Sequence, residues 1–277
     1  MWASVDGMSH LGELAFVGLG LWSERSISLL GVEEAKMADI VFAELYTSLM
    51  PELNLSKLEK LIGKRVHVVL RHDLEEDCGK RILETARKAK AVLLVPGDPL
   101  IATTHVDLRI RAEKQGIKTK IVQGASIISA VMGLSGLQNY KFGRSVTIPF
   151  LNVGATDSTP YNTIARNQKA GLHTLCFLDV RAEERRYMTV EEAFSVLSAL
   201  ESKKQHHAVT DDTLAIGIAR AGSENPDVKA DYVKRLRAFD FGRPPHSLVF
   251  PGRLHFMEAE ALITLANAPE GIREMVK

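Results

Sequence analysis

The sequence predicts an α/β fold, because short apolar runs typical of buried strands alternate with segments of helical periodicity along its 277 residues. Strands that alternate with helices in this way favour a mainly parallel, doubly wound sheet. The clearest strand is residues 91–95, five apolar residues in succession, which indicates burial on both faces. A chain of this length more often forms two domains than one. We place the boundary near Lys141 to Arg144, between an N-terminal α/β domain of residues 1–142 and a C-terminal α/β domain of residues 143–277.

Apolar runs and helix signals define the elements of the first domain. Its predicted strands are residues 13–17, 40–43, 66–70, 91–95 and 119–122. Its predicted helices begin near Ser28, cover residues 55–62 up to Gly63, cover residues 80–89, and run from a Ser126 cap through Leu134. Residues 1–12 lack the basic start and apolar centre of a signal peptide, so we expect a loose extension there.

The second domain is predicted from similar signals. Its strands are residues 145–150, 174–178, 214–219 and 247–250. Its helices are one that ends at Gly171, one over residues 190–200 that follows Thr189, and a closing helix over about residues 257–266. A polar loop is expected at residues 152–159.

The turn Pro96-Gly97-Asp98-Pro99 ends the clearest strand abruptly. Pro96 has no N–H for the sheet, Pro99 keeps Asp98 out of the helical region, and Gly97 can take a positive φ. Asp98 thus follows the carboxyl end of a buried strand, where open α/β sheets bind ligands. Its carboxylate could accept hydrogen bonds from a ribose hydroxyl or an amine, or it could bond only nearby backbone amides in an Asx-type turn.

A helix is predicted directly after this turn. It opens around Thr103 and Thr104, with Asp107 in a capping-box-like position, and Gly116 is placed to end it. His105, beside the helix start, is expected to pack or to cap.

Other motifs give weaker signals. The Gly18-Leu19-Gly20 segment lacks the third glycine of a dinucleotide fingerprint, because Ser23 stands there, so it indicates a tight turn with close backbone approach. The chain contains no GxxxxGK[ST] phosphate loop and no GxSxG elbow, so nothing supports covalent catalysis. His246 follows two prolines, and on spacing alone we interpret it as structural.

Metal and disulfide chemistry also lack support. Cys78 and Cys176 stand far apart outside any CxxC pattern, and the neighbours His206 and His207 lie in a polar stretch without an HExxH motif. We therefore predict no metal. The segment RAEERR, residues 181–186, is typical of a solvated face, although beside a cleft its basic residues could steer a carboxylate-bearing substrate.

Composition excludes some partners. Lys and Arg number 35 against 34 Asp and Glu, so no global charge excess indicates nucleic acid or an anionic membrane. No apolar run approaches the roughly 18 residues of a membrane helix. We therefore expect a cytoplasmic protein with no nucleic-acid or membrane partner.

Several long blocks, in one order along nearly the whole chain, resemble the diphthine synthases, methyltransferases of the tetrapyrrole methylase-like fold. The blocks are FVGLGL (residues 16–21), VFAELYTSLM (41–50), PGDPLIATTHVDLRIRA (96–112), YKFG (140–143), GLHTLCFLDV (171–180), TDDTL (210–214), ARAGS (219–223) and FGRPPH (241–246). Departures from the family fall at residues 132–135, in the loop 151–160 and in the first dozen residues.

The resemblance implies a fold, a cofactor and a substrate. In this family, S-adenosylmethionine lies folded in a cleft between two α/β domains, and methyl groups pass to the modified histidine of translation elongation factor 2 during diphthamide biosynthesis. The resemblance also implies a homodimer. Carried over by motif, the cofactor contacts are Leu21, Asp98, Ile101, Ser126, Ile127, Leu178, Ala221 and His246.

The chemistry agrees with the absence of a catalytic triad. A methyl group on a sulfonium is already activated, so the protein must mainly bind, align and desolvate the reactants. No residue can be named as a general base. Two alternatives stay open: a methyltransferase of the same fold that acts on a tetrapyrrole or ribosomal RNA, and a non-catalytic module that binds the elongation factor.

Overall fold

The computed structural model describes residues 12–150 and 157–276, and the chain divides into two compact units, Met1–Ser126 and Ile127–Lys277. This division falls earlier than the boundary expected near Lys141 to Arg144. Helix α6 (Ile127–Ser135) belongs to the second unit because its Val131 is buried in an apolar cluster there, beside α10 (Phe256–Ala266). The predicted N-terminal extension and the predicted loop at 152–159 fall largely outside the described residues.

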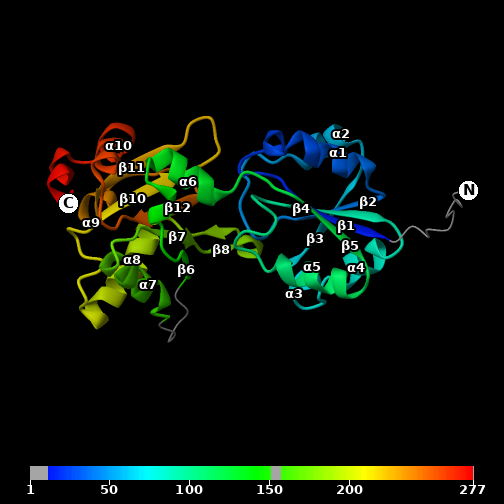
Figure 1. Ribbon diagram of the computed structural model, residues 1–277, viewed down its shortest axis with the longest axis horizontal. Coiled ribbons are helices and arrows are strands. Elements are labelled where there is room, and N and C mark those ends of the chain that lie inside the picture. Colours follow the sequence, from blue (N-terminus) through cyan, green and yellow to red (C-terminus); the bar gives the residue numbers. More distant parts are fainter. Residues whose placement is uncertain (1–11, 151–156, 277) are drawn as a thin grey trace, which may run out of the picture. The chain divides into compact units, whose positions relative to one another are not determined.

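The first unit is a parallel sheet of five strands in the order β3-β2-β4-β1-β5 (Figure 1). The strands are β1 (Glu13–Gly18), β2 (Ile40–Glu44), β3 (Val66–Val69), β4 (Lys90–Val95) and β5 (Lys118–Val122). The helices are α1 (Leu29–Met37), α2 (Leu55–Ile62), α3 (Arg71–Glu75), α4 (Lys80–Ala86) and α5 (His105–Lys114). The predicted parallel sheet is confirmed, and every predicted strand agrees with the structure to within one residue at each end.

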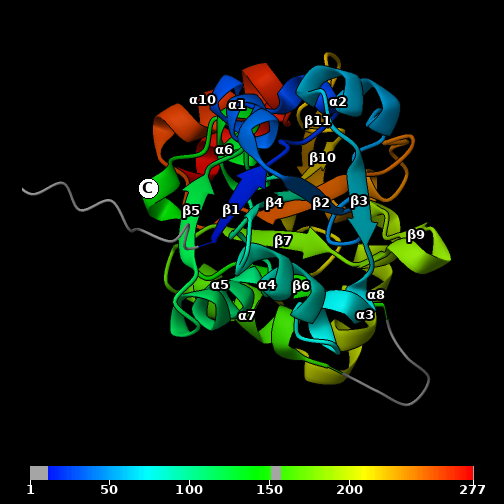
Figure 2. The same ribbon diagram turned by 90° about the vertical axis from the view of Figure 1, so that its right-hand side faces the viewer.

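Both faces of this sheet are covered, as a doubly wound fold requires. Alternate residues of β1 point to opposite faces: Leu14 and Phe16 pack with α4 and α5, whereas Ala15 and Val17 pack with α1 and α2. Figure 2 shows α1 and α2 on one side of the sheet and α3, α4 and α5 on the other.

Strands β1 and β4 are neighbours whose following helices cover opposite faces. Helix α1, which follows β1, packs on one face, and α5, which follows β4, packs on the other. The carboxyl ends of β1 and β4 therefore form the topological switch point, where open α/β sheets bind ligands. The predicted turn at Asp98 lies there.

The second unit contains a five-stranded sheet of different character, in the order β11-β10-β12-β7-β6. Its strands are β6 (Val146–Ile148), β7 (Thr174–Leu178), β10 (Leu214–Ala219), β11 (Asp227–Tyr232) and β12 (His246–Phe250). Only β6 and β7 pair in parallel, and the other pairs are antiparallel. Strand β11 (DVKADY) was not predicted, because its polar and apolar residues alternate and form no continuous apolar run.

Helices cover both faces of this sheet as well. Helices α7 (Thr159–Lys169) and α8 (Val190–Lys204) pack on one face through side chains such as Tyr161 and Phe194. Helices α6 and α10 pack on the other face, where Ile216 and Ile218 of β10 are buried. In the described part of the chain, no helix is long and apolar enough to cross a membrane.

Candidate functional site

Three glycines bring the loops at the carboxyl edge of the first sheet into close contact. A Cβ atom built on Gly18 would lie 2.5 Å from the carbonyl oxygen of Gly97 and 2.6 Å from Cα of Gly124. A Cβ atom on Gly124 would lie 2.8 Å from Cα of Gly18. Any side chain at Gly18 or Gly124 would therefore force the segments after β1, β4 and β5 apart. This confirms the close backbone approach predicted at Gly18.

The loops after β1 and β4 are also hydrogen-bonded to each other. The Gly97 N–H donates to the Gly20 carbonyl at 2.7 Å, and the Gly20 N–H donates to the Gly97 carbonyl at 3.2 Å. Both glycines have positive φ, 77° and 73°, which side-chain-bearing residues rarely adopt. The half-buried Leu21 follows this bridge directly.

The carboxylate of Asp98 lies in the turn that this bridge holds. Its Oδ1 atom accepts the N–H of Leu100 at 3.1 Å, which is the expected Asx-type bond. Its Oδ2 atom has no hydrogen-bond partner among the described residues, so one acceptor remains for a ligand. Ile101 is 40% exposed, and its N–H lies 3.5 Å from the Asp98 carbonyl.

The helix after the turn begins where the sequence predicted, but its cap differs. Helix α5 starts at His105, and the side chain of the N-cap residue Thr104 makes no capping bond. Asp107 instead accepts from Nε of Arg111 at 2.5 Å, so the predicted capping box is wrong. Thr103 replaces it: its hydroxyl donates to the Pro99 carbonyl at 3.2 Å and accepts the His105 N–H at 3.4 Å.

A buried polar pair lies under this turn. Glu44, the last residue of β2, is fully buried, and His105 is 2% exposed. Burial raises the pKa of the Glu44 carboxyl, although His105, Thr47 and Tyr46 act in the opposite direction. Glu44 was not among the predicted site residues. The sequence signal that could have identified it is a carboxylate directly after the apolar residues 40–43, at the sheet edge where ligands bind.

In the second unit, three predicted residues lie at one edge of the sheet. Strand β12 runs antiparallel to both neighbours, pairing His246 with Ala219 of β10 and Ser247 with Phe177 of β7. The start of β12 therefore meets the ends of β7 and β10. Leu178 ends β7, and Ala221 follows β10 by two residues, so both lie at the edge where His246 begins its strand.

One of the two ring nitrogens of His246 has no hydrogen-bond partner among the described residues. Its Nδ1 accepts the N–H of Val190 at 3.4 Å, so Nε2 carries the proton of the neutral ring. Nε2 is buried without a hydrogen-bond partner in the described protein, and the side chain is 8% exposed. Burial, followed by the nearby charge of Arg220, lowers the pKa of His246 and keeps the ring neutral.

Arg220 holds the loop that leads to His246. Its Nη1 donates to the Phe241 carbonyl at 2.6 Å, its backbone N–H donates to the Pro245 carbonyl at 2.8 Å, and Asp227 pairs with its guanidinium. Arg220 stands inside the ARAGS block but was not among the predicted site residues.

The predicted cofactor contacts thus group at two sheet edges, one within each unit. At the first edge lie Leu21, Asp98, Ile101 and Ser126, which follow β1, β4 and β5. At the second lie Leu178, Ala221 and His246. Ile127 is the first residue of α6 and packs on the apolar cluster that contains Ala221.

The predicted basic segment RAEERR, residues 181–186, makes local contacts. Arg186 and Arg181 of the RAEERR segment lie over the Phe150 ring, at 3.8 and 5.2 Å from its centroid. Arg185 is exposed at the turn between the short strands β8 (Val180–Arg181) and β9 (Arg186–Tyr187).

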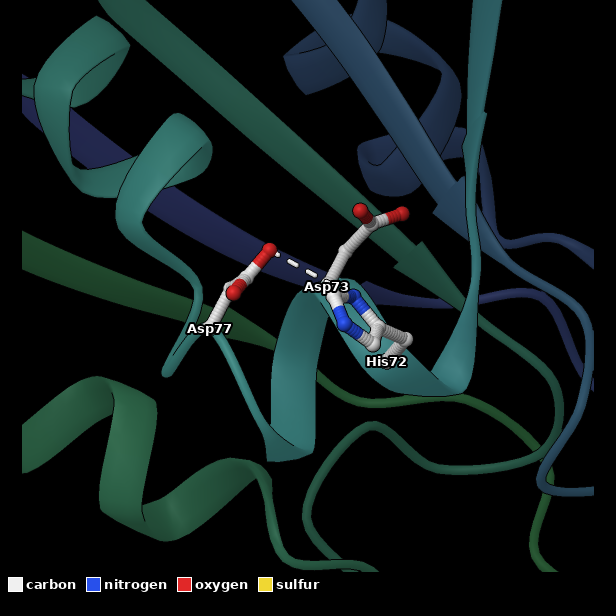
Figure 3. A group of neighbouring side chains, drawn as sticks. All are labelled: His72, Asp73 and Asp77. Atoms are coloured by element: carbon white, nitrogen blue, oxygen red, sulfur yellow. Dashed lines mark ion pairs between the residues drawn. The ribbon is translucent and has the colours of Figure 1, made fainter.

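A group formed by His72 and Asp73 of α3 and by Asp77 just after it has potential ligand atoms within 4.8 Å of one another (Figure 3). Local roles account for it. The His72 ring nitrogens lie 3.4 Å from Glu76 and 3.4 Å from Asp77, and Oδ2 of Asp73 accepts the Leu70 N–H at 2.7 Å. We assign no metal to these side chains.

Substitution by alanine is expected to change the stability of the protein in opposite directions at Gly124 and at Gly133. Gly124→Ala is expected to destabilise the protein by about 1–3 kcal/mol, because the new methyl group meets backbone atoms that cannot move aside alone. Gly133→Ala, inside α6 with nothing near the new Cβ atom, is expected to stabilise by about 0.5–1 kcal/mol. Urea denaturation measures both changes. Equal stability of Gly124→Ala and wild type would show that these loops part at little cost.

Comparison with known proteins identifies the class. The family described as Tetrapyrrole (Corrin/Porphyrin) Methylases matches residues 13–236, which include every strand of the first sheet and most of the second unit. This match agrees with the predicted α/β fold class, and it makes the chain a methyltransferase by family.

Full-length relatives give the group within that class. Diphthine synthase of Methanosarcina mazei is 50% identical over 269 residues, which cover 95% of this chain and 100% of the relative. That of Methanothermobacter thermautotrophicus is 45% identical over 262 residues, with 94% and 98% covered. A crystal structure of a diphthine synthase matches with a TM-score of 0.86 and 42% identity, covering 95% of this chain and 99% of that one. The chain belongs to the diphthine synthases of the tetrapyrrole methylase family.

Proposed function

We propose that the protein acts as a diphthine synthase: it transfers methyl groups from S-adenosylmethionine to the modified histidine of translation elongation factor 2 in diphthamide biosynthesis. The observation that carries the proposal is the 50% identity to a diphthine synthase along that relative's whole length. The structure also supports the proposal, because the topological switch point is lined by glycines and offers Oδ2 of Asp98 as an acceptor. The proposal includes a homodimer in the cytoplasm.

The residues present fit this cofactor by their chemistry. S-adenosylmethionine carries hydroxyl and ammonium donors, a carboxylate and an apolar-faced adenine. The first sheet edge offers Oδ2 of Asp98 as an acceptor and the exposed Ile101 as an apolar surface. The second edge offers the apolar Leu178 and the unpartnered Nε2–H of His246, a buried donor that needs an acceptor.

The proposed cofactor contacts are those carried over by motif. They are Leu21, Asp98, Ile101, Ser126, Ile127, Leu178, Ala221 and His246. When bound, the cofactor supplies a methyl group on a positively charged sulfur, which needs no activation by the protein. The protein's own part is to hold, orient and desolvate the reactants, so the proposal requires neither a metal nor a covalent enzyme intermediate. No side chain is proposed as a general base.

Mass spectrometry of the protein substrate tests the function. Elongation factor 2 that carries the aminocarboxypropyl-modified histidine is incubated with the protein and S-adenosylmethionine, and unmodified factor serves as the control. We expect whole methyl increments on the modified histidine alone, and their number gives the methyl count. Transfer to a tetrapyrrole or ribosomal RNA with a silent factor would instead support the related methyltransferase. Binding of the factor without transfer would support the non-catalytic module.

A further inference from the structure

We propose that His105, which packs beside Glu44, is a positioning residue that fixes the Pro99 carbonyl and through it the carboxylate of Asp98. The inference rests on the proposed function, because it concerns the turn that would bind the cofactor. Neither residue is catalytic. His105 is 2% exposed and Glu44 is fully buried, so neither side chain can touch a substrate.

The ring of His105 anchors the turn from below. Its Nδ1 lies 3.2 Å from the Pro99 carbonyl oxygen, and because a carbonyl can only accept, Nδ1 carries the proton. The hydroxyl of Thr103 donates to the same oxygen at 3.2 Å. Two donors thus hold the Pro99–Leu100 peptide, whose N–H donates to Oδ1 of Asp98, in a proline-bounded turn with little freedom of its own.

The carboxylate of Glu44 is itself held rigidly. Its Oε2 accepts the N–H groups of Tyr46 and Thr47, each at 3.1 Å, and its Oε1 accepts the Thr47 hydroxyl at 2.5 Å. Oε1 also faces Nε2 of His105 at 3.8 Å. With the proton on Nδ1, Nε2 is an acceptor like Oε1, so no hydrogen bond joins the two atoms, and Glu44 lies beside the ring without orienting it.

Packing alone does not account for this pair. A buried carboxylate and imidazole cost free energy that apolar side chains of similar volume avoid, and Nε2 of His105 remains without a hydrogen-bond partner among the described residues. The pair stands at the carboxyl ends of the adjacent strands β2 and β4, directly under the turn. The buried imidazole is best explained by the atom that it holds, the Pro99 carbonyl.

The second unit supplies a matched control. His173 and Glu258 form another buried pair, at 2.9 Å, but His173 precedes β7 and so lies at the opposite end of that strand from Leu178. Substitutions at His173 should lower stability without a change in cofactor affinity.

Calorimetry with S-adenosylmethionine tests the proposal on folded variants. In His105→Asn, the side-chain amide nitrogen can take the place of Nδ1 and still donate to Pro99. His105→Gln carries its amide near the position of Nε2 and loses that bond. We expect His105→Gln to weaken binding about tenfold, the effect of one hydrogen bond, whereas His105→Asn retains most of the affinity. His173→Gln is expected to bind as the wild type does.

Four outcomes separate the hypotheses. Wild-type affinity in His105→Gln would overturn the positioning role, and so would an equal loss in the Asn and Gln variants, because the ring's packing would then be responsible. If His105→Gln does not fold, Thr103→Val removes the second donor to Pro99, and unchanged affinity there would overturn the proposal. A wild-type protein that fails to bind the cofactor would remove the proposed function itself.

Discussion

Asp98→Asn is expected to weaken S-adenosylmethionine binding about 10- to 100-fold with the fold intact, the range for loss of a charge-assisted hydrogen bond. The asparagine Oδ1 can still accept the Leu100 N–H, so the turn is kept. The second oxygen becomes an NH₂ donor, which cannot accept from a hydroxyl or an ammonium group. Calorimetry measures the affinity, and circular dichroism confirms the fold.

Asp39→Asn is the control for this substitution. Oδ2 of Asp39 accepts the Lys90 N–H at 2.8 Å at the other end of β4, so the same chemical change is made on an exposed side chain far along the strand from the turn. Its affinity should equal that of the wild type. Unchanged affinity in Asp98→Asn as well would limit Asp98 to its local hydrogen bond and remove it from the proposed site.

Glu258→Ala is expected to lower the free energy of unfolding by about 3–5 kcal/mol, the effect of breaking a buried charged network. The Glu258 carboxylate is fully buried, accepts the backbone N–H groups of Gln138 and His255 at 2.9 and 2.8 Å, and pairs with Lys141 and His173. Its loss leaves four donors without their acceptor. Urea denaturation measures the change.

Acid should weaken the same network. Burial by itself would raise the pKa of Glu258, but bonds from Lys141, His255, Gln138 and His173 outweigh it and lower this pKa to about 2. Because the pKa is depressed in the folded state, the stabilisation is present above the unfolded value of 4.5 and is lost as the pH falls toward 2. Burial also lowers the pKa of His173, which adds a loss below 6.5. Stability should fall less steeply with acid in Glu258→Gln than in the wild type.

Glu260→Gln controls for the helix position and the charge change. Glu260 lies on the same helix and pairs with Arg273 at 2.5 and 3.0 Å, but both side chains are exposed, and exposed ion pairs contribute little to stability. Its denaturation midpoint should stay close to that of the wild type. A loss as large as that of Glu258→Ala would show that helix α10, and not the buried network, determines the effect.

The sequence predicted the first sheet well because its central strands β1, β2 and β4 contain continuous apolar runs. Residues 91–95 illustrate this, since Pro96 and Gly97 fix the end of the strand. The alternating polarity of β11 offered no such run, and the antiparallel pairing of the second sheet is a tertiary property. The capping box failed for a local reason, because Asp107 accepts from Arg111 and Thr104 makes no capping bond.

The candidate site residues come from the resemblance to the family and much less from local physics. Spacing alone made His246 a structural residue, whereas the structure shows its buried, unpartnered nitrogen. Glu44 and His105 lie far apart in the sequence, and their pairing depends on β2 and β4 being neighbours in the sheet. No single-sequence pattern specifies that neighbourhood.

The hydrogen-bonded bridge between Gly20 and Gly97 has a consequence for how a ligand would be bound at the first sheet edge. Because the two loops are joined in the folded chain, their backbone freedom is lost during folding and not during binding, which favours affinity through pre-organisation. Ligand affinity at this edge then depends on the pairing of β1 with β4. Substitutions that loosen the pairing of β1 with β4 would weaken binding from a distance, without touching the ligand.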